Sequence, residues 1–130
     1  MIPVCADPLR AELAAWSESL IADMIVSAYS RLVADHQTRE GLVRCHVLLW
    51  RHLLGGTDKA ETFRQELGRQ APRAGIKETA IHALNKQILA ELVYVTASRF
   101  QRSPKLAGDY SLEIMRAACW LTDARQLAAA

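Results

Sequence analysis

LGRQAPRAGI, residues 67–76, is the stretch that divides this chain, because the sequence on either side of it has the spacing of long helices. It contains Gly68, Pro72 and Gly75. Glycine weakens a helix through its conformational freedom, and proline lacks the N–H that a helix interior needs. The stretch therefore predicts a short, irregular helical segment with no long continuation.

Apolar residues recur every three or four positions on both sides of this stretch, and no strand-type alternation competes with that pattern. The sequence therefore predicts an all-α protein. The expected inner faces are Leu13, Trp16, Leu20, Met24 and Ala28 in a first helix; Leu42, Cys45, Leu49 and Leu53 in a second; Ile81, Leu84, Ile88, Leu92 and Val95 in a fourth; and Tyr110, Ile114, Ala118 and Leu121 in the last.

Capping residues predict where the first two helices begin and end. Asp7–Pro8 opens the first helix, as an acidic cap followed by a proline at the first helical position. The polar residues 35–38 close it, and Thr38 can cap the second helix. Gly55–Gly56 stops that second helix, because glycine adopts positive φ at low cost.

The remaining helices have similar boundary residues. Asp58 and Glu61 have capping-box spacing, which predicts the start of the third helix. The longest uninterrupted helical pattern runs from Lys77 to about Phe100, and Ser103–Pro104 separates it from the last helix.

Composition limits the function classes. At 130 residues the chain has the size of one domain, residues 1–130, and its net charge of +2 is too small for a nucleic-acid-binding surface. Its apolar runs, such as Val47–Trp50, are far shorter than the roughly 20 residues that cross a bilayer. The first residues lack the basic and apolar regions of a secretory signal. We therefore expect a cytoplasmic protein with no nucleic-acid or membrane partner.

No local signature of catalysis is found in the sequence. The cysteines Cys5, Cys45 and Cys119 share no spacing of a zinc site or a disulfide framework. No nucleophilic triad and no glycine-rich loop after a strand is recognisable, and the acidic residues are scattered over outward positions. We therefore expect no enzymatic activity and no catalytic residues.

Several single residues have two interpretations. His46 and His82 lie at the edges of apolar faces, where a neutral imidazole either ligates a metal or makes a hydrogen bond to the backbone. Tyr29 lies in an apolar arc, so its hydroxyl is either a structural hydrogen-bond donor or a donor in a pocket. Cys45 faces inward, which favours an inert buried thiol over a redox sensor.

Four stretches, in their order and spacing, resemble the globin domain of bacterial globin-coupled sensors, or sensor globins. They are AYSRL at 28–32, WRHLLGGTD at 50–58, LGRQAPRAGI at 67–76, and residues 114–124 in the last helix. The resemblance implies an all-α, globin-like helical fold that is shortened at the N-terminus and in the connection near residues 35–42.

The same resemblance implies a set of pocket residues. In sensor globins the segment that matches residues 67–76 carries the histidine that ligates haem iron, and here that position is Ala71. The family's distal tyrosine, which hydrogen-bonds bound oxygen, falls on Tyr29. The other implied cofactor-binding residues are Leu42, Cys45, Leu49, Ile81 and His82.

A haem without an axial protein bond relies on burial alone and cannot transmit iron movement to a helix. The substitution at Ala71 therefore predicts a haem-free regulatory or signalling domain, with a pocket that is closed by side chains or takes a small apolar ligand. The alternative is a haem-binding gas, oxygen or redox sensor that uses His82 or His46 as axial ligand, with no other metal. A third interpretation is a purely structural helical adaptor.

Sensor globins pair through their last two long helices into a four-helix bundle. The resemblance therefore implies a homodimer through Lys77–Phe100 and Tyr110–Leu127, with Tyr94 and Trp120 as exposed anchors, and a signalling protein as a further partner.

Overall fold

The computed structural model describes residues 8–129, with side chains up to residue 122. This part of the chain is all-α, as the sequence predicts, and contains no strand. Its five helices are α1 (Pro8–Leu32), α2 (His36–Gly55), α3 (Lys59–Arg73), α4 (Glu78–Arg99) and α5 (Pro104–Ala129).

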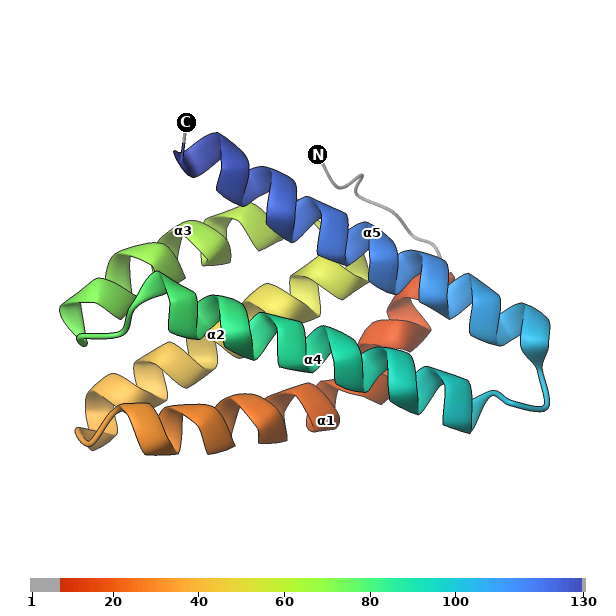
Figure 1. The fold of residues 1–130 in the computed structure, drawn as a ribbon, viewed down its shortest axis with the longest axis horizontal. Helices are drawn as coiled ribbons and strands as arrows, with labels where there is room; N and C mark the ends of the chain where they lie inside the picture. The colour runs from red at the N-terminus through yellow and green to blue at the C-terminus, as the bar shows by residue number, and fades with distance from the viewer. Residues whose placement is uncertain (1–7, 130) are drawn as a thin grey trace.

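Successive helices cross the molecule in opposite directions, and α4 and α5 lie in front of the others in Figure 1. α2 packs closely against α1 and α3 and also approaches α5, while α4 packs mainly against α5. None of the helices, within the part of the chain that the structure describes, is both long and apolar enough to cross a bilayer.

The break at residues 67–76 lies later than the sequence predicts. α3 continues through Gly68 and Pro72 and ends at Arg73, so the expected irregular segment is a regular helix. Pro72 is tolerated because it lies in the last turn and removes only the hydrogen bond to the carbonyl four residues earlier. The chain turns at Gly75, whose φ is 77°.

The same hydrogen-bonded motif ends α2 and α3. The N–H of Ile76 donates to the carbonyl of Ala71 at 2.9 Å, across the left-handed Gly75. The N–H of Thr57 likewise donates to the carbonyl of His52 at 3.0 Å, across Gly56 with φ 74°. Each glycine is required because L side chains rarely adopt positive φ. The predicted stop at Gly55–Gly56 is confirmed.

The predicted start of α3 at Asp58 is confirmed, but the side-chain caps predicted for α2 and α3 are wrong. α2 begins at His36 and is capped by Asp35, whose carboxylate accepts hydrogen bonds from the Thr38 N–H at 2.9 Å and the Thr38 hydroxyl at 2.6 Å. These bonds lower the pKa of Asp35. At α3, Asp58 makes no side-chain cap bond, because its backbone is already helical, and Glu61 pairs with Arg64. The cap expected at Asp7 lies outside the described residues.

The predicted inner face of α2 is confirmed, whereas those of three other helices are confirmed in part. The predicted residues that are buried in these helices are Leu13, Ala28, Leu84, Ile88, Leu92, Tyr110 and Ile114, and the remaining predicted ones are only partly buried. In α1 the buried line passes through Ser17 and Ile21, so Trp16, Leu20 and Met24 are only partly buried. Ser17 is tolerated inside because its hydroxyl donates to the Leu13 carbonyl at 2.6 Å. Helix periodicity alone does not fix this centre, since it depends on where neighbouring helices pack. In α4 and α5 the fully buried residues include Thr96 and Ala117 in place of Val95 and Ala118.

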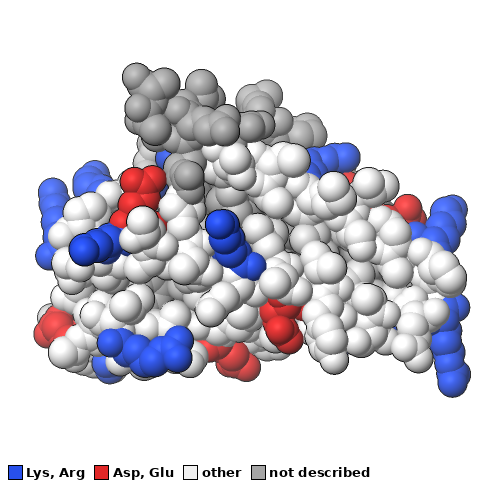
Figure 2. All heavy atoms as spheres, viewed as in Figure 1, with Lys and Arg blue, Asp and Glu red and all other residues white. Residues whose placement is uncertain are grey.

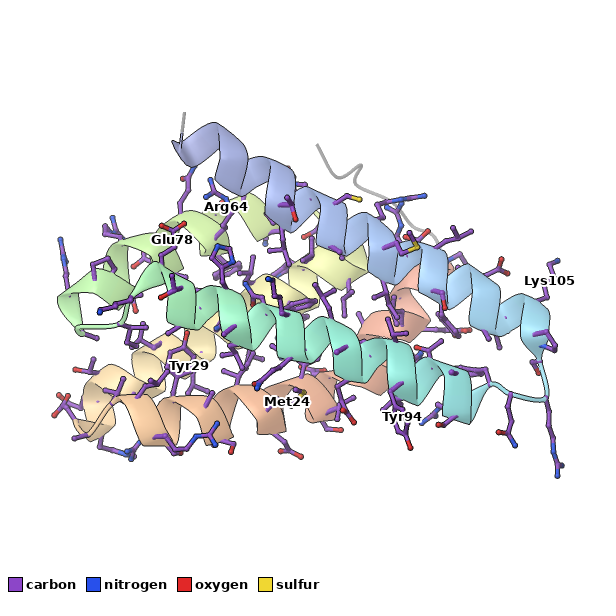
Figure 3. The ribbon with its side chains drawn as sticks, viewed as in Figure 1. Met24, Tyr29, Arg64, Glu78, Tyr94 and Lys105 are labelled. Carbon is purple, nitrogen blue, oxygen red and sulfur yellow. The ribbon has the colours of Figure 1, made fainter. Side chains whose placement is uncertain are left out.

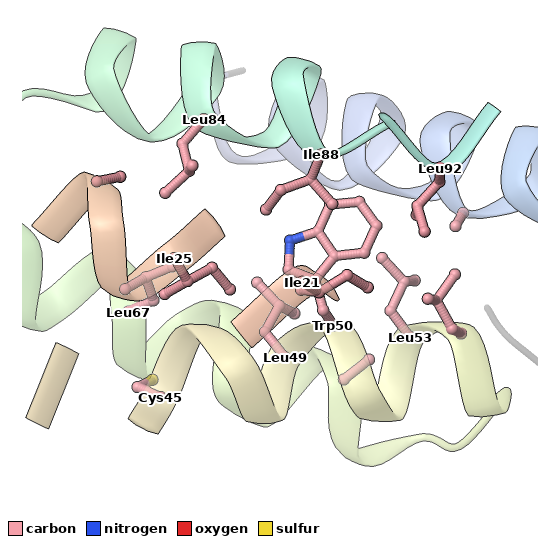
Figure 4. Packing of buried hydrophobic residues seen from close by; sticks show 14 of the residues in the cluster. Ile21, Ile25, Cys45, Leu49, Trp50, Leu53, Leu67, Leu84, Ile88 and Leu92 are labelled. Carbon is pink, nitrogen blue, oxygen red and sulfur yellow. The ribbon is translucent and has the colours of Figure 1, made fainter. Parts of the chain in front are cut away.

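Trp50 is the largest fully buried side chain of the described residues. In Figure 4 its indole lies between α2 and the side chains of Ile88 and Leu92 on α4. One aromatic ring therefore fills the centre of the core.

The two glycines of the 67–76 stretch predict opposite effects of alanine. Gly75→Ala should lower the free energy of unfolding by about 1 kcal/mol, because alanine is strained at positive φ. Gly68→Ala should raise it by up to about 1 kcal/mol, since Gly68 lies inside α3 and an added methyl meets no atom within 4 Å. Urea denaturation followed by circular dichroism measures both. Equal effects would contradict the assigned end of α3.

Candidate functional site

A chain of polar side chains crosses the apolar core and joins three helices. The Tyr29 hydroxyl of α1 lies 2.8 Å from Nδ1 of His46 on α2. Nε2 of His46 lies 2.8 Å from Oδ1 of Asn85 on α4, and Nε1 of Trp50 lies 3.0 Å from the same oxygen. Tyr29, His46 and Trp50 are fully buried. We call these four residues the core network.

The direction of each hydrogen bond follows from Trp50. An indole N–H only donates, so the Asn85 atom that faces it must be the carbonyl oxygen. That oxygen accepts, so Nε2 of His46 carries the proton that is donated to it. Nδ1 of His46 is then an acceptor, and the Tyr29 hydroxyl donates to it. Every ring nitrogen in the core network has a partner.

Burial keeps the core network uncharged. Loss of solvation lowers the pKa of His46 to about 4, although the hydrogen bond to Asn85 opposes this shift. Burial, and secondarily the nearby Cys45, raises the pKa of Tyr29 well above its ordinary value. Neither residue therefore changes charge near neutral pH, and neither is poised as an acid or a base.

The structure brings only some of the implied pocket residues together. Those on α1, α2 and α3 are all buried, namely Tyr29, Leu42, Cys45, Leu49 and Ala71. Ile81 and His82, on α4, are only partly buried. Tyr29 meets His46 instead of an open pocket. The predicted backbone partner of His46 is wrong, because both ring nitrogens bond to side chains.

Cys45 matches the expected inert thiol. Its S–H points to the Phe63 carbonyl of α3 at 3.4 Å. Burial, together with the negative charge of Glu66, raises the pKa of the Cys45 thiol to about 11. Because the thiolate is the reactive form, this cysteine stays protonated and unreactive near neutral pH.

Asn85 is the residue of the core network that the sequence pattern did not single out. It lies one position from Leu84 and three from Ile88, at the edge of the inner face of α4. The signal that could have identified it is a polar amide beside the apolar stripe of a helix. Its partners are 35 and 39 residues away in the sequence, so only the fold connects them.

The residues between α2 and α3 do not fit a haem. The two helices pack directly, with the Cys45 thiol on the Phe63 carbonyl and the His52 ring stacked on Phe63 at 5.3 Å between ring centres. The two best-defined hollows of the molecule measure about 10 Å³ each, room for about one water, whereas ligand sites span roughly 300–1,000 Å³. Ala71 offers a methyl group and no ligand atom.

Neither alternative histidine is arranged as an axial ligand. His46 uses both ring nitrogens within the core network. Nε2 of His82 is itself buried, although the side chain is partly exposed, and it lies 4.0 Å from the carboxylate of Glu78 one turn earlier in α4. In residues 8–122 no group of three or more histidine, cysteine or acidic side chains could hold a metal ion.

A second feature lies on the outside of α4 and α5. Exposed apolar residues recur there at three- and four-residue spacing, as in helices that pair. Val93, Tyr94, Leu112 and Met115 are between 49% and 67% exposed. We define the α4–α5 face as Ala90, Val93, Tyr94 and Ala97 of α4 with Leu112, Met115 and Cys119 of α5.

The α4–α5 face has few charges near its middle. Figure 2 views the molecule from the side of these helices and shows broad uncharged areas between separate charged side chains, with one basic and one acidic side chain near the middle of the view. Tyr94 projects away from α4, as Figure 3 shows, so its predicted exposure is confirmed. Trp120 is partly buried against the core and is not an exposed anchor, which corrects that prediction.

Comparison with family models, with curated proteins and with solved structures found no match.

The buried imidazole predicts a specific loss of stability in acid. The pKa of His46 falls from 6.5 to about 4 on folding, so its contribution is complete above pH 6.5 and is lost as pH falls toward 4. The unfolded chain binds the extra proton in this window, and the loss amounts to about 3 kcal/mol. His46→Gln supplies an oxygen for Tyr29 and an N–H for Asn85 but does not titrate.

Urea denaturation of both proteins, from about pH 7 to about pH 4, isolates this contribution from other titrating groups. The stability difference between wild type and His46→Gln should change by about 3 kcal/mol across the window. Parallel pH curves would contradict a buried neutral His46.

Proposed function

We propose that this chain is a haem-free regulatory domain of the sensor-globin kind, which acts by pairing with a second copy of itself and by binding a signalling partner. The proposal includes a cytoplasmic location and no enzymatic activity. The observation that carries it is the α4–α5 face, an exposed apolar stripe on two neighbouring helices.

The α4–α5 face can form the centre of a contact with a second copy of the chain. It covers eight residues of each helix, which is about 12 Å of length, so at about 10 Å of width per helix it presents roughly 240 Å². A standard protein interface buries about 800 Å² per partner, so the surrounding surface must contribute the remainder. An antiparallel helix pair can meet its own copy across a two-fold axis, which gives a four-helix bundle.

The filled core supports the haem-free part of the proposal. The direct packing of α2 on α3, and a His46 whose two ring nitrogens both have side-chain partners, favour a domain that does not bind haem. The two best-defined hollows, of about 10 Å³ each, are too small for an apolar ligand, which favours a pocket closed by side chains. Signalling then depends on the surface of the domain.

Pairing predicts that one charge on the α4–α5 face will separate the copies. Leu112→Glu should raise the dimer dissociation constant at least about tenfold, because an unpaired carboxylate would be buried in the interface. Val26→Glu is the matched control, since Val26 is 48% exposed but lies on α1. Sedimentation velocity measures both. A wild-type monomer at high micromolar concentration, or equal effects of the two changes, would contradict the proposal.

A haem titration tests the haem-free part of the proposal. Added haem should keep the absorbance spectrum of free haem in the presence of the protein, because neither Ala71 nor His46 provides a free ligand atom. A shifted Soret band that His82→Ala abolishes would support the haem-binding alternative instead.

A further inference from the structure

We infer that Asn85 is a positioning residue that couples the core network to the α4–α5 face, so that the strength of self-association depends on hydrogen bonds inside the domain. This inference rests on the proposed pairing and adds a means of regulating it. It requires that α4 is held in place by the core network and that the same helix carries part of the face.

The backbone of α4 packs near α5, α1 and α3 but stays away from α2. α2 brings Cα atoms within 8 Å of α1, α3 and α5, but none within 8 Å of α4. Two long side chains of α2, His46 and Trp50, fill this gap, and both end on the amide of Asn85. The attachment of α4 to α2 therefore depends on side chains more than on close backbone packing.

Hydrogen bonds fix this attachment more precisely than apolar contacts do. Ile88 and Leu92 lie on the Trp50 ring in Figure 4, and such contacts are non-directional, so they permit sliding and rotation. The two N–H groups that meet at Oδ1 of Asn85 require defined distances and angles. Together the two hydrogen bonds set the distance of α4 from α2 and the rotation of α4 about its own axis.

The α4–α5 face begins five residues after Asn85 on the same helix, at Ala90, and continues to Ala97. A helix rotates as a unit, so a turn of about 20° moves its Cα atoms by about 1 Å. Loss of the Asn85 oxygen leaves two buried N–H groups without an acceptor, and α4 must then shift to admit water or a new partner. The apolar stripe shifts with it.

The test compares dimer dissociation constants and amide hydrogen exchange in α4. Asn85→Leu removes the acceptor, whereas Asn85→Asp keeps an oxygen for both N–H groups. Leu67→Ala is the control for general destabilisation, because Leu67 is buried on α3, away from the face. Trp50→Phe removes one hydrogen-bond donor and keeps an aromatic ring. It replaces Asn85→Leu in the test if Asn85→Leu does not fold.

We expect Asn85→Leu to raise the dissociation constant about tenfold and to speed exchange in α4, with a rise of about threefold for Trp50→Phe. Asn85→Asp and Leu67→Ala should stay within about twofold of wild type. A folded Asn85→Leu variant with an unchanged dissociation constant and unchanged exchange would overturn the coupling alone. So would an equal loss in Leu67→Ala. A monomeric wild type would overturn the pairing and the coupling together.

Discussion

The hydrogen bond from the Trp50 indole to Oδ1 of Asn85, at 3.0 Å, is the constraint on which the interior depends. Because the indole only donates, it orients the amide, selects the tautomer of His46 and makes Tyr29 a donor. The resulting hydrogen bonds join α1, α2 and α4. An unpaired buried donor costs about 1–3 kcal/mol, so the four residues form a unit that is stable only when complete.

This interior accounts for where function can lie. The Trp50 ring occupies the space between α2 and α4, and α2 packs directly on α3. Tyr29, which the family resemblance assigns to a gas ligand, donates to an imidazole of the same chain. The interior is occupied by the protein's own groups, whereas the outer side of α4 and α5 remains apolar and uncovered. We therefore propose interaction through that surface.

Much of the fold was predictable from periodicity and glycine placement. The inner face of α2 and the stop at Gly56 follow from local physics, so the sequence was sufficient for them. The end of α3 was not, because one proline near a helix end removes a single hydrogen bond, and Gly75 makes the turn. Choosing Asp35 over Thr38 as cap required the backbone angles.

The candidate site was predictable in part. Tyr29 and His46 were recognisable as polar groups on apolar faces, but their pairing with each other and with Asn85 depends on helices far apart in sequence. Burial of Trp120 depends in the same way on how α5 lies against the core. The exposure of Tyr94 was easier to predict, because Tyr94 lies on the side of α4 opposite its buried residues.

The protonation of His46 tests the account most directly. Nitrogen-15 NMR of the histidine side chains distinguishes the two neutral tautomers and the charged ring. The account predicts a neutral His46 at neutral pH, with the proton on Nε2 and an unprotonated Nδ1 that accepts from Tyr29. A proton on Nδ1 alone, or a charged ring at neutral pH, would contradict it.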